Sequence, residues 1–327
     1  MNNLRTAIFN ISNYQELALQ VFRYQYQHNR LYREYVDLLS VNPQLVNRLE
    51  AIPFLPIRFF KSHTVICGDA LPAQWFESSG TTGMTNSRHY VADLRLYRES
   101  FQQGFEKFYG DPSGYAILGL LPSYLERQHS SLVMMVDELI QQSEVKESGF
   151  YLYEHHKLKD TLLDLEARQQ KTLLIGVTFA LLDFAEAYPI PLKHTILMET
   201  GGMKGRREEM TRAEVHAVLA NAFQVPAIHS EYGMTELLSQ GYSDGRGIFK
   251  PADTMRILLR DDDDPMAVRA AGDKPYRGII NVIDLANLDS CAFIATEDAG
   301  VLYPDGSFEV TGRVDHSDIR GCSLMVV

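Results

Sequence analysis

Between about Trp75 and Pro226, apolar runs of strand length alternate with longer helical patterns. The strand candidates are Tyr115–Leu121, Thr172–Thr178 and Thr195–Met198. The helix candidates are Asp93–Tyr109, Ser130–Gln142, His156–Gln170 and Arg207–Ala222. This alternation predicts βαβ units and a largely parallel sheet, in which ligands bind at the carboxyl ends of the strands. We therefore predict an α/β core over residues 75–236.

The segment before this core has a different pattern. Residues 1–74 are predicted to form a helical region followed by a connector, and Ser12 with Gln15 would form a capping box for the first long helix. Pro53 and Pro56 forbid a continuous helix across the connector. We expect this connector to be extended.

After the core, the pattern changes to short strands, which predicts a small β subdomain over residues 237–312 and a hinge-like tail over residues 313–327. Pro304-Asp305-Gly306 is a strong hairpin signal. The strand candidates of this part are Met255–Leu259, Gly278–Asp284, Ala292–Thr296, Gly300–Tyr303 and Ser307–Val310.

Composition excludes several classes of protein. The chain of 327 residues has a net charge of −11, which argues against nucleic acid as a main partner because phosphate binding normally requires clustered Lys and Arg. No apolar run reaches membrane-spanning length, and no secretory signal is recognisable at the start. Three widely spaced cysteines, Cys67, Cys291 and Cys322, fit neither a disulfide framework nor a paired metal site. We expect a reduced, cytoplasmic protein without a membrane span.

The first stretch with chemical content is Ser78-Ser79-Gly80-Thr81-Thr82-Gly83. Its glycines let the backbone approach an anion closely, and its hydroxyls can donate to phosphate oxygens. It lacks the Gly-Lys-Ser/Thr ending of the common nucleotide P-loop. Taken alone, it is either a phosphate-binding loop or an ordinary surface loop.

The second stretch, Ser230–Glu236, combines groups that suit a nucleotide. The ring of Tyr232 can stack on a base, Gly233 allows close approach, the hydroxyl of Thr235 can contact phosphate, and the carboxylate of Glu236 can bind Mg²⁺. The alternative is a strand end with a chance Tyr-Gly turn.

The third stretch is Thr296–Gly300, followed after a hairpin by Thr311-Gly312-Arg313. The carboxylate of Asp298 can accept two hydrogen bonds from a vicinal diol, and Arg313 can add donors beside it. Alone, this stretch would be interpreted as a turn.

In this order the three stretches resemble the SSGTTG, YGxTE, TGD and TGR motifs of the adenylate-forming superfamily of acyl-CoA synthetases and related ligases, over roughly residues 75–320. The resemblance implies the large N-terminal domain of that superfamily, with ATP and Mg²⁺ as cofactors and activation of a carboxylic acid to an acyl-adenylate. The nucleotide-binding residues that it implies are Ser79, Gly80, Thr81, Thr82, Gly83, Gly201, Gly202, Tyr232, Gly233, Thr235, Asp298 and Arg313.

The same resemblance implies a role for each part. Ser79, Thr81 and Thr82 would hold the β- and γ-phosphates, and Gly201-Gly202 would back the adenine. Tyr232 would flank that base, Thr235 would contact the α-phosphate, Glu236 would coordinate Mg²⁺, and Asp298 would hold the ribose hydroxyls.

Two departures from the superfamily pattern matter. The loop continues with Met84-Thr85-Asn86-Ser87 in place of Pro-Lys, so Mg²⁺, backbone amides and Arg88 or Lys204 would have to balance the pyrophosphate charge. Superfamily members also carry a mobile C-terminal domain with a catalytic Lys, whereas this sequence ends near the expected hinge at 313–321. This argues against ordinary CoA ligation by domain rotation.

The sequence is most similar to the acyl-protein synthetases of the LuxE family, which lack the mobile domain. The shared-looking features are Ile52–Pro56 with Phe59-Phe60-Lys61, Leu121–Arg127 with His129-Ser130-Ser131, and Arg320-Gly321-Cys322-Ser323-Leu324. In such proteins a Cys near the terminus accepts the fatty acyl group and passes it to a partner reductase. The matching residue is Cys322, and Arg320 could lower the pKa of its thiol.

Other assignments stay open on the sequence alone. Cys322 could be a structural residue of a docked terminal strand. His129 could line an acyl pocket and take part in catalysis, or be a structural residue at a helix start. The acyl group could pass directly to CoA or to a carrier-protein thiol, and the chain could also be a nucleotide-binding protein without catalysis. The identity of the acid is not determined.

Overall fold

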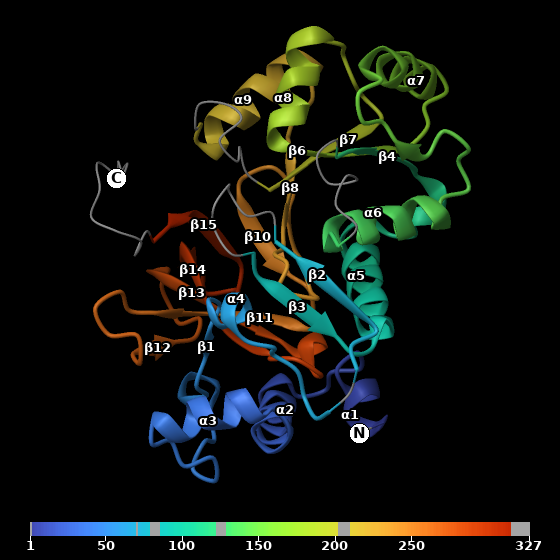
Figure 1. Cartoon of the computed structure of the whole chain (residues 1–327). Helices are drawn as coiled ribbons and strands as arrows, with labels where there is room; N and C mark the ends of the chain where they lie inside the picture. The colour runs from blue at the N-terminus through green and yellow to red at the C-terminus, as the bar shows by residue number, and fades with distance from the viewer. Residues whose placement is uncertain (1, 70, 79–85, 122–128, 202–209, 315–327) are drawn as a thin grey trace.

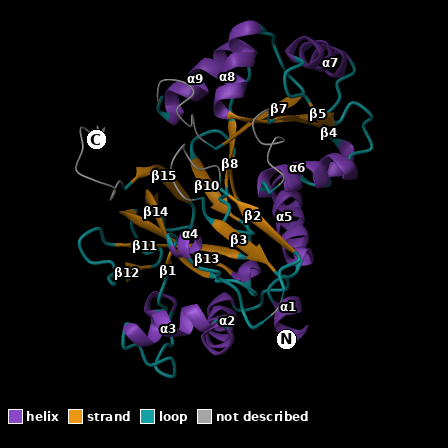
Figure 2. Ribbon diagram, viewed as in Figure 1, coloured by secondary structure: helices purple, strands orange, loops and turns teal. Residues whose placement is uncertain are grey.

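The computed structural model describes residues 2–69, 71–78, 86–121, 129–201 and 210–314. Within these ranges, a long twisted sheet passes through the molecule, with helices packed around it (Figures 1 and 2). The sheet has a parallel half and an antiparallel half. The N-terminal helices lie against the antiparallel half (Figure 1).

The parallel half confirms the predicted βαβ core. Its neighbouring strands are, in spatial order, β5 (Gly149–Phe150), β4 (Ala116–Leu120), β6 (Thr172–Val177), β7 (Thr195–Thr200) and β8 (His229–Tyr232). Its helices are α5 (Leu94–Tyr109), α6 (Ser131–Gln142), α7 (His155–Ala167), α8 (Thr178–Ala187) and α9 (Arg212–Phe223). Because β4 and β6 are buried along their whole length, their sequences are continuous apolar runs, as expected for a parallel sheet covered on both faces.

Three details of the predicted core need correction. The helix predicted at Arg207–Ala222 begins at Arg212, where the N-cap Thr211 and Glu214 form a capping box. The helix predicted at His156–Gln170 ends at Ala167. The strand predicted to end at Met198 continues to Thr200.

The antiparallel half consists of the short strands that the sequence predicts near its end. They are β9 (Gly241–Ser243), β10 (Ile248–Pro251), β11 (Met255–Arg260), β12 (Val268–Arg269), β13 (Tyr276–Asp284), β14 (Phe293–Leu302) and β15 (Phe308–Arg313). The separate strands predicted at Ala292–Thr296 and Gly300–Tyr303 are wrong, since both belong to the single strand β14. The predicted turn after it is present, with Gly306 at φ +83°. The sheet continues without a break from β8 through β9 and β10 to β15, so the domain limits at 236 and 312 stay predictions.

The N-terminal region is helical, as predicted. It contains α1 (Asn2–Ala7), α2 (Tyr14–His28) and α3 (Arg30–Leu38), followed by a 3-10 turn η1 (Leu49–Ala51). The predicted capping box at Ser12 is wrong: Asn13 is the N-cap of α2, and its side chain accepts a hydrogen bond from the Glu16 amide at 3.2 Å.

The connector docks on the sheet. Its short strand β1 (Leu55–Pro56) pairs in parallel with β14, and it continues into the single-turn helix α4 (Phe59–Ser62). A separate hairpin follows, formed by β2 (Gln74–Glu77) and β3 (Arg88–Val91). The remaining short turns are η2 (Pro112–Gly114) and η3 (Leu285–Asn287).

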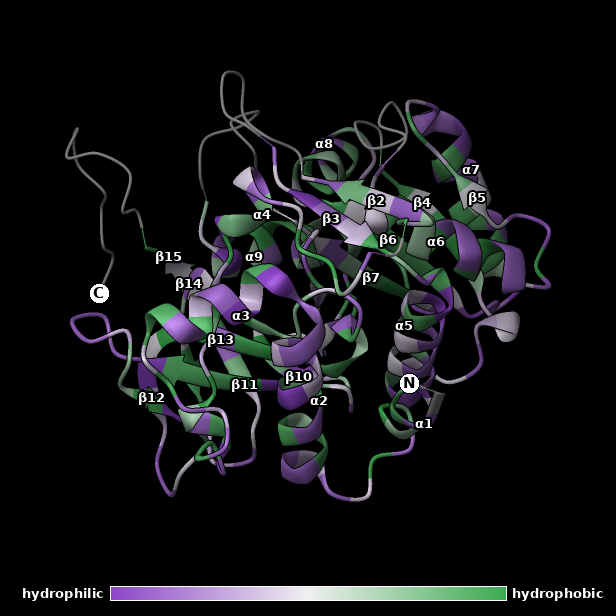
Figure 3. Cartoon of the chain, turned by 60° about the horizontal axis from the view of Figure 1, so that its bottom comes forward, coloured by the Kyte–Doolittle hydropathy of each residue, from purple (hydrophilic) through white to green (hydrophobic). Residues whose placement is uncertain are grey.

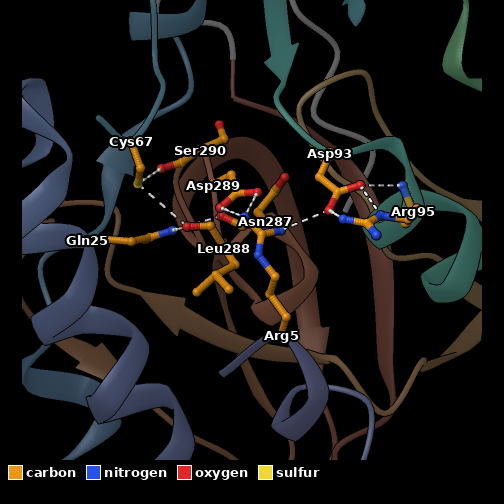
Figure 4. Close-up of polar contacts among 9 residues, drawn as sticks. All are labelled: Arg5, Gln25, Cys67, Asp93, Arg95, Asn287, Leu288, Asp289 and Ser290. Atoms are coloured by element: carbon orange, nitrogen blue, oxygen red, sulfur yellow. Dashed lines mark hydrogen bonds and ion pairs between the residues drawn. The ribbon is translucent and has the colours of Figure 1, made fainter. Parts of the chain in front are cut away.

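A polar cluster fastens the N-terminal region to the rest of the chain (Figure 4). Arg5 lies between Asp93, at the start of α5, and Asp289, with nitrogen–oxygen distances of 3.2 and 2.7 Å. The amide of the fully buried Gln25 donates to the carbonyls of Asn287 and Leu288 at 2.8 and 3.0 Å. Because these partners are far apart in the sequence, the cluster fixes the N-terminal helices against the antiparallel half.

Hydropathy follows this architecture. Figure 3 shows hydrophobic residues concentrated on the interior strands and polar residues on the outer turns of the helices. None of the described helices combines the length and apolar content that a membrane crossing requires.

Candidate nucleotide site

The base of the predicted phosphate loop is a closed hairpin. Glu77 at the end of β2 pairs with Arg88 at the start of β3. The Ser78 amide donates to the Ser87 carbonyl at 3.0 Å, and the Ser87 amide donates to the Ser78 hydroxyl at 2.9 Å. Ser79, Gly80, Thr81, Thr82 and Gly83 lie outside the described residues. The structure therefore shows where this loop leaves and rejoins the fold.

Two side chains connect this hairpin to the Tyr232–Glu236 stretch. His89 on β3 donates through Nδ1 to the Thr235 carbonyl at 2.9 Å. The Ser87 side chain hydrogen-bonds to the Glu236 carboxylate. The hairpin that carries the first predicted stretch thus meets the second stretch, although more than 140 residues separate His89 from Thr235.

His89 is a residue that sequence reasoning missed. It is fully buried, with its ring edge-on to Phe60 at 5.5 Å, and burial lowers its pKa to about 4. The imidazole is therefore neutral at physiological pH, with its proton on Nδ1, and its Nε2 has no hydrogen-bond partner among the described residues. In the sequence, His89 is marked only by its position two residues after Ser87, which closes the base of the hairpin.

Tyr232 connects the second stretch to the third. Its hydroxyl donates to Asp298 Oδ2 at 3.0 Å, and Arg313 Nε lies 3.3 Å from Asp298 Oδ1. Asp298 and Arg313 are direct cross-strand partners in the β14–β15 ladder, which accounts for their pairing. Burial raises the pKa of the Asp298 carboxyl, while Arg313 and the Tyr232 hydroxyl oppose that rise.

Tyr232 itself is more enclosed than the prediction of an adenine-stacking ring suggests. Its side chain is only 8% exposed. The ring packs edge-on against Phe308 at 5.2 Å and tilted against Phe249 at 5.9 Å. The face that packs on these phenylalanines is therefore closed to a ligand.

Glu236 is a buried carboxylate, with 6% exposure. Burial raises its pKa, whereas the Ser87 hydrogen bond and the charges of Arg313 and Lys61 lower it. Over the described ranges, no cation lies within ion-pair distance of it. A buried carboxylate without a paired cation is well suited to a metal ion.

The carboxyl ends of β7 and β8 carry a second pair of acids. The hydroxyl of Thr200 donates to Glu231 Oε2 at 2.5 Å, and Glu199 is held by the Thr178 hydroxyl at 3.2 Å. Burial raises the pKa of Glu231 to about 7; the Thr200 hydrogen bond opposes this rise, and the neighbouring charge of Glu199 adds to it. This pair also escaped sequence reasoning, because Glu199 and Glu231 come together only through the register of β7 and β8.

The structure explains why glycine stands at two positions of the predicted site. Gly201 ends β7 with φ +70°, a left-handed conformation that other residues rarely adopt, and its carbonyl accepts from the Thr178 hydroxyl at 2.8 Å. A Cβ at Gly233 would collide with the Glu231 carboxylate. Gly202 lies outside the described residues.

Comparisons with known proteins give a family-model match and a fold likeness. Residues 10–101 match the family model described as acyl-protein synthetase, LuxE. A comparison with curated proteins gives no match. Among solved structures, ATP-bound MatB from Rhodopseudomonas palustris is similar with a TM-score of 0.54 and 18% identity, over 73% of this chain and 47% of that one.

Two further solved structures are similar to this chain to about the same degree. O-succinylbenzoate coenzyme A synthetase from Bacillus subtilis, in complex with AMP, has a TM-score of 0.51 and 17% identity, over 74% of this chain and 50% of that one. A long-chain-fatty-acid-CoA ligase from Archaeoglobus fulgidus has a TM-score of 0.50 and 13% identity, over 73% and 50%. The chain has the fold of the large N-terminal domain of adenylate-forming enzymes. It spans about half the length of these structures.

His129 lies beside the loop hairpin. Its ring stacks on Trp75 of β2 with centroids 4.0 Å apart, and its carbonyl accepts from the Glu77 amide at 2.8 Å. Its Nδ1 has no partner among the described residues. The structure thus places His129 beside the start of the phosphate loop, and its catalytic role stays a prediction.

Of the three cysteines, Cys67 and Cys291 are buried free thiols. Burial raises the pKa of Cys67 and raises that of Cys291 to about 12, so neither is a thiolate near neutral pH. Cys322 lies outside the described residues.

Proposed function

We propose that this protein activates a carboxylic acid, of the fatty-acid class, by reaction with ATP to give an acyl-adenylate and pyrophosphate. The observation that carries the proposal is a set of contacts beside the three predicted stretches: His89 and Ser87, at the base of the loop hairpin, bind the Thr235–Glu236 segment, and Tyr232 binds Asp298. These contacts support the proposal that the three stretches bind a single ATP molecule.

In the proposed reaction, an oxygen of the acid attacks the α-phosphorus in line, and the bond to the pyrophosphate oxygen breaks. The loop at Ser78–Gly83 would receive the β- and γ-phosphates, and the Thr235 hydroxyl the α-phosphate. Asp298, oriented by Tyr232 and Arg313, would accept hydrogen bonds from the ribose hydroxyls. Gly201 and Gly202 would leave room for the adenine.

Glu236 fits the Mg²⁺ that such chemistry requires, because it is buried and unpaired within the described part of the chain. No three His, Cys, Asp or Glu side chains of the described ranges gather into a metal site. Mg²⁺ typically binds through one or two carboxylates and the substrate phosphates. The ion, when bound, supplies neutralisation of phosphate charge.

For the second half of the reaction, we propose that Cys322 attacks the acyl carbonyl, AMP leaves, and the thioester passes to a partner protein such as a reductase. The match to the LuxE model supports this assignment. Cys67 and Cys291 are both buried, and burial raises the pKa of both thiols, which argues against either of them as the nucleophile.

The test distinguishes the adenylation step from the acyl-transfer step. A panel of carboxylic acids is assayed for acid-dependent exchange of pyrophosphate into ATP, and the protein is then analysed by mass spectrometry for a hydroxylamine-labile adduct. Cys322→Ser should keep the exchange and lose the adduct, whereas the matched control Cys67→Ala should keep both. ATP binding without exchange, for every acid tested, would refute the proposed adenylation. Acyl transfer to CoA or a carrier-protein thiol by Cys322→Ala would refute the self-acylation step alone.

A further inference from the structure

A cavity of about 440 Å³ lies between the N-terminal region and the antiparallel half of the sheet. Helix α3 and the connector at residues 48–58 form one wall, and strands β11, β13 and β14 with the turn at 262–268 form the other. Cavities of about 300–1,000 Å³ are typical of small-molecule sites. Its volume is therefore sufficient for a small organic ligand.

Arg260, at the end of β11, is one of three arginines that line this cavity, together with Arg48 and Arg58. Its Nη1 donates to Asn281 Oδ1 at 2.6 Å and to the Ile280 carbonyl at 3.3 Å, and its Nη2 donates to the Thr296 carbonyl at 2.5 Å. A guanidinium has five N–H donors, so Nε–H and one Nη2–H remain without a partner in the described structure. All three partners of Arg260 are neutral, and its charge has no carboxylate within ion-pair distance there.

Asn281, on β13, lines the cavity beside Arg260. Its side chain is 1% exposed, and its Nδ2 has no hydrogen-bond partner among the described residues. The bond from Arg260 fixes the amide orientation, because a flipped amide would place its NH₂ against a guanidinium N–H. A buried amide donor without a partner costs free energy, which a ligand oxygen would recover.

The acidic residues of the cavity do not oppose an anion bound next to Arg260 and Asn281. Glu297 is already paired with Arg58. Asp262 is exposed, and its charge is therefore screened by solvent. Glu50 is partly exposed and lies on the opposite wall, in the connector.

The rest of the lining is largely apolar. It includes the buried side chains of Phe54 and Ile279, at 6% and 3% exposure, and the exposed side chain of Met266. We propose that this cavity binds an amphipathic anion, whose carboxylate or phosphate accepts hydrogen bonds from Arg260 and Asn281 and whose apolar part lies against Phe54, Ile279 and Met266.

This site is separate from the nucleotide site. On β14, Ala295, Thr296 and Glu297 line the cavity, whereas Asp298 hydrogen-bonds to Tyr232 at the nucleotide site. The inference therefore does not depend on the proposed adenylation.

The test is isothermal titration of the full chain with decanoate, decyl phosphate and decanol. At least one of the two anions should bind saturably with one site per chain, decanol should bind at least tenfold more weakly, and the stronger anion identifies the head group. Asn281→Asp keeps the acceptor for Arg260 but replaces the free donor by a negative oxygen. It should weaken anion binding at least tenfold while the melting temperature is kept.

A second variant avoids the buried position. Met266 is 56% exposed, so Met266→Glu should fold normally and weaken the same anion through its charge on the apolar wall. Binding that both cavity variants keep at the wild-type affinity is binding at another site, such as the acid site of the proposed adenylation. Absence of saturable binding by both anions, or equal binding by wild type and both cavity variants, would overturn the proposal.

Discussion

Two buried carboxylates, Asp284 and Glu236, lie close together in the fold but differ in how they are satisfied. Asp284 is fully buried and accepts hydrogen bonds from the amides of Leu238, Ser239 and Ala286 at 2.7, 3.0 and 3.1 Å, and from the Ser239 hydroxyl at 2.5 Å. Within the described part of the chain, the donors to Glu236 are the Ser87 side chain and its own amide. Burial raises the pKa of both carboxyls.

The difference indicates which acid serves the fold and which serves a ligand. The donors around Asp284 occupy its lone pairs, so it fixes the start of the antiparallel half and has no capacity left. Glu236 keeps free lone pairs at the predicted ATP site. Asn287 couples the two regions, since its amide donates to the Glu236 carbonyl at 2.8 Å and lies 3.4 Å from Asp284 Oδ2.

The largest expected effect is that of Glu236→Gln on activity. The amide keeps the shape and removes the charge that would bind Mg²⁺, so we expect pyrophosphate exchange to fall by a factor of about 100 to 1,000, or roughly 3–4 kcal/mol of transition-state stabilisation. The free energy of unfolding should stay the same or rise, because an unpaired buried charge is removed. The exposed Glu106→Gln on α5 is the matched control. Full exchange activity in Glu236→Gln would contradict this part of the comparison.

Asp284→Asn should show the reverse pattern, with a loss of stability and an activity close to that of wild type. The NH₂ group would face the amides of Leu238 and Ser239, and we expect a loss of about 3 kcal/mol in the free energy of unfolding. Urea unfolding measures this loss, while the specific activity of the folded fraction should stay near that of wild type. Asp253→Asn, at a 72% exposed side chain paired with Lys107, should change stability by less than about 0.5 kcal/mol. An Asp284→Asn protein that unfolds like wild type would show that the donor count does not distinguish the two acids.

His89 extends the comparison from the two acids to a buried basic side chain. Its pKa in the folded state, about 4, lies below the value of about 6.5 in the unfolded chain. As pH falls through about 6.5 the unfolded chain takes up the proton first, so stability falls until the pH reaches about 4. Between about pH 7.5 and pH 4.5 this amounts to about 2.5 kcal/mol.

The measurement is the difference in urea-unfolding free energy between wild type and His89→Gln across that pH range. The difference is required because Glu231, with its raised pKa of about 7, stabilises the fold as pH falls and so acts in the opposite direction. Gln can still donate to the Thr235 carbonyl, which preserves the link between hairpin and motif. Parallel pH profiles of the two proteins would show that His89 does not titrate in this way.

The sequence predicts the parallel core because its signals are local. The apolar runs of β4 and β6 and the Pro304-Asp305-Gly306 turn each depend on a few adjacent residues. The break predicted within β14 is wrong for a physical reason: Glu297 and Asp298 are polar and resemble a turn, but Arg58 of the connector pairs with Glu297 and Arg313 of β15 pairs with Asp298.

The candidate site was predictable only in part. The chemistry of Tyr232, Glu236 and Asp298 is visible in the sequence, whereas the roles of His89 and Asp284 depend on contacts between residues 45 or more positions apart. Such contacts follow from strand register and packing, for which a single sequence has no local signal. The same holds for the unpaired Nδ2 of Asn281.

The smallest expected effect is that of Tyr232→Phe. The ring keeps its packing on Phe308, and only the hydroxyl that donates to Asp298 is lost, so we expect a cost of about 1 kcal/mol, seen as a roughly fivefold higher KM for ATP. Because that hydrogen bond lowers the pKa of Asp298, its loss should raise this pKa and move the acid limb of the pH–exchange profile to higher pH. Tyr303→Phe, which removes a comparable hydroxyl bond to Glu309 at 3.2 Å, is the matched control and should change neither quantity. If Tyr232→Phe leaves both the KM and the acid limb in place, Asp298 does not need its tyrosine to hold a ligand.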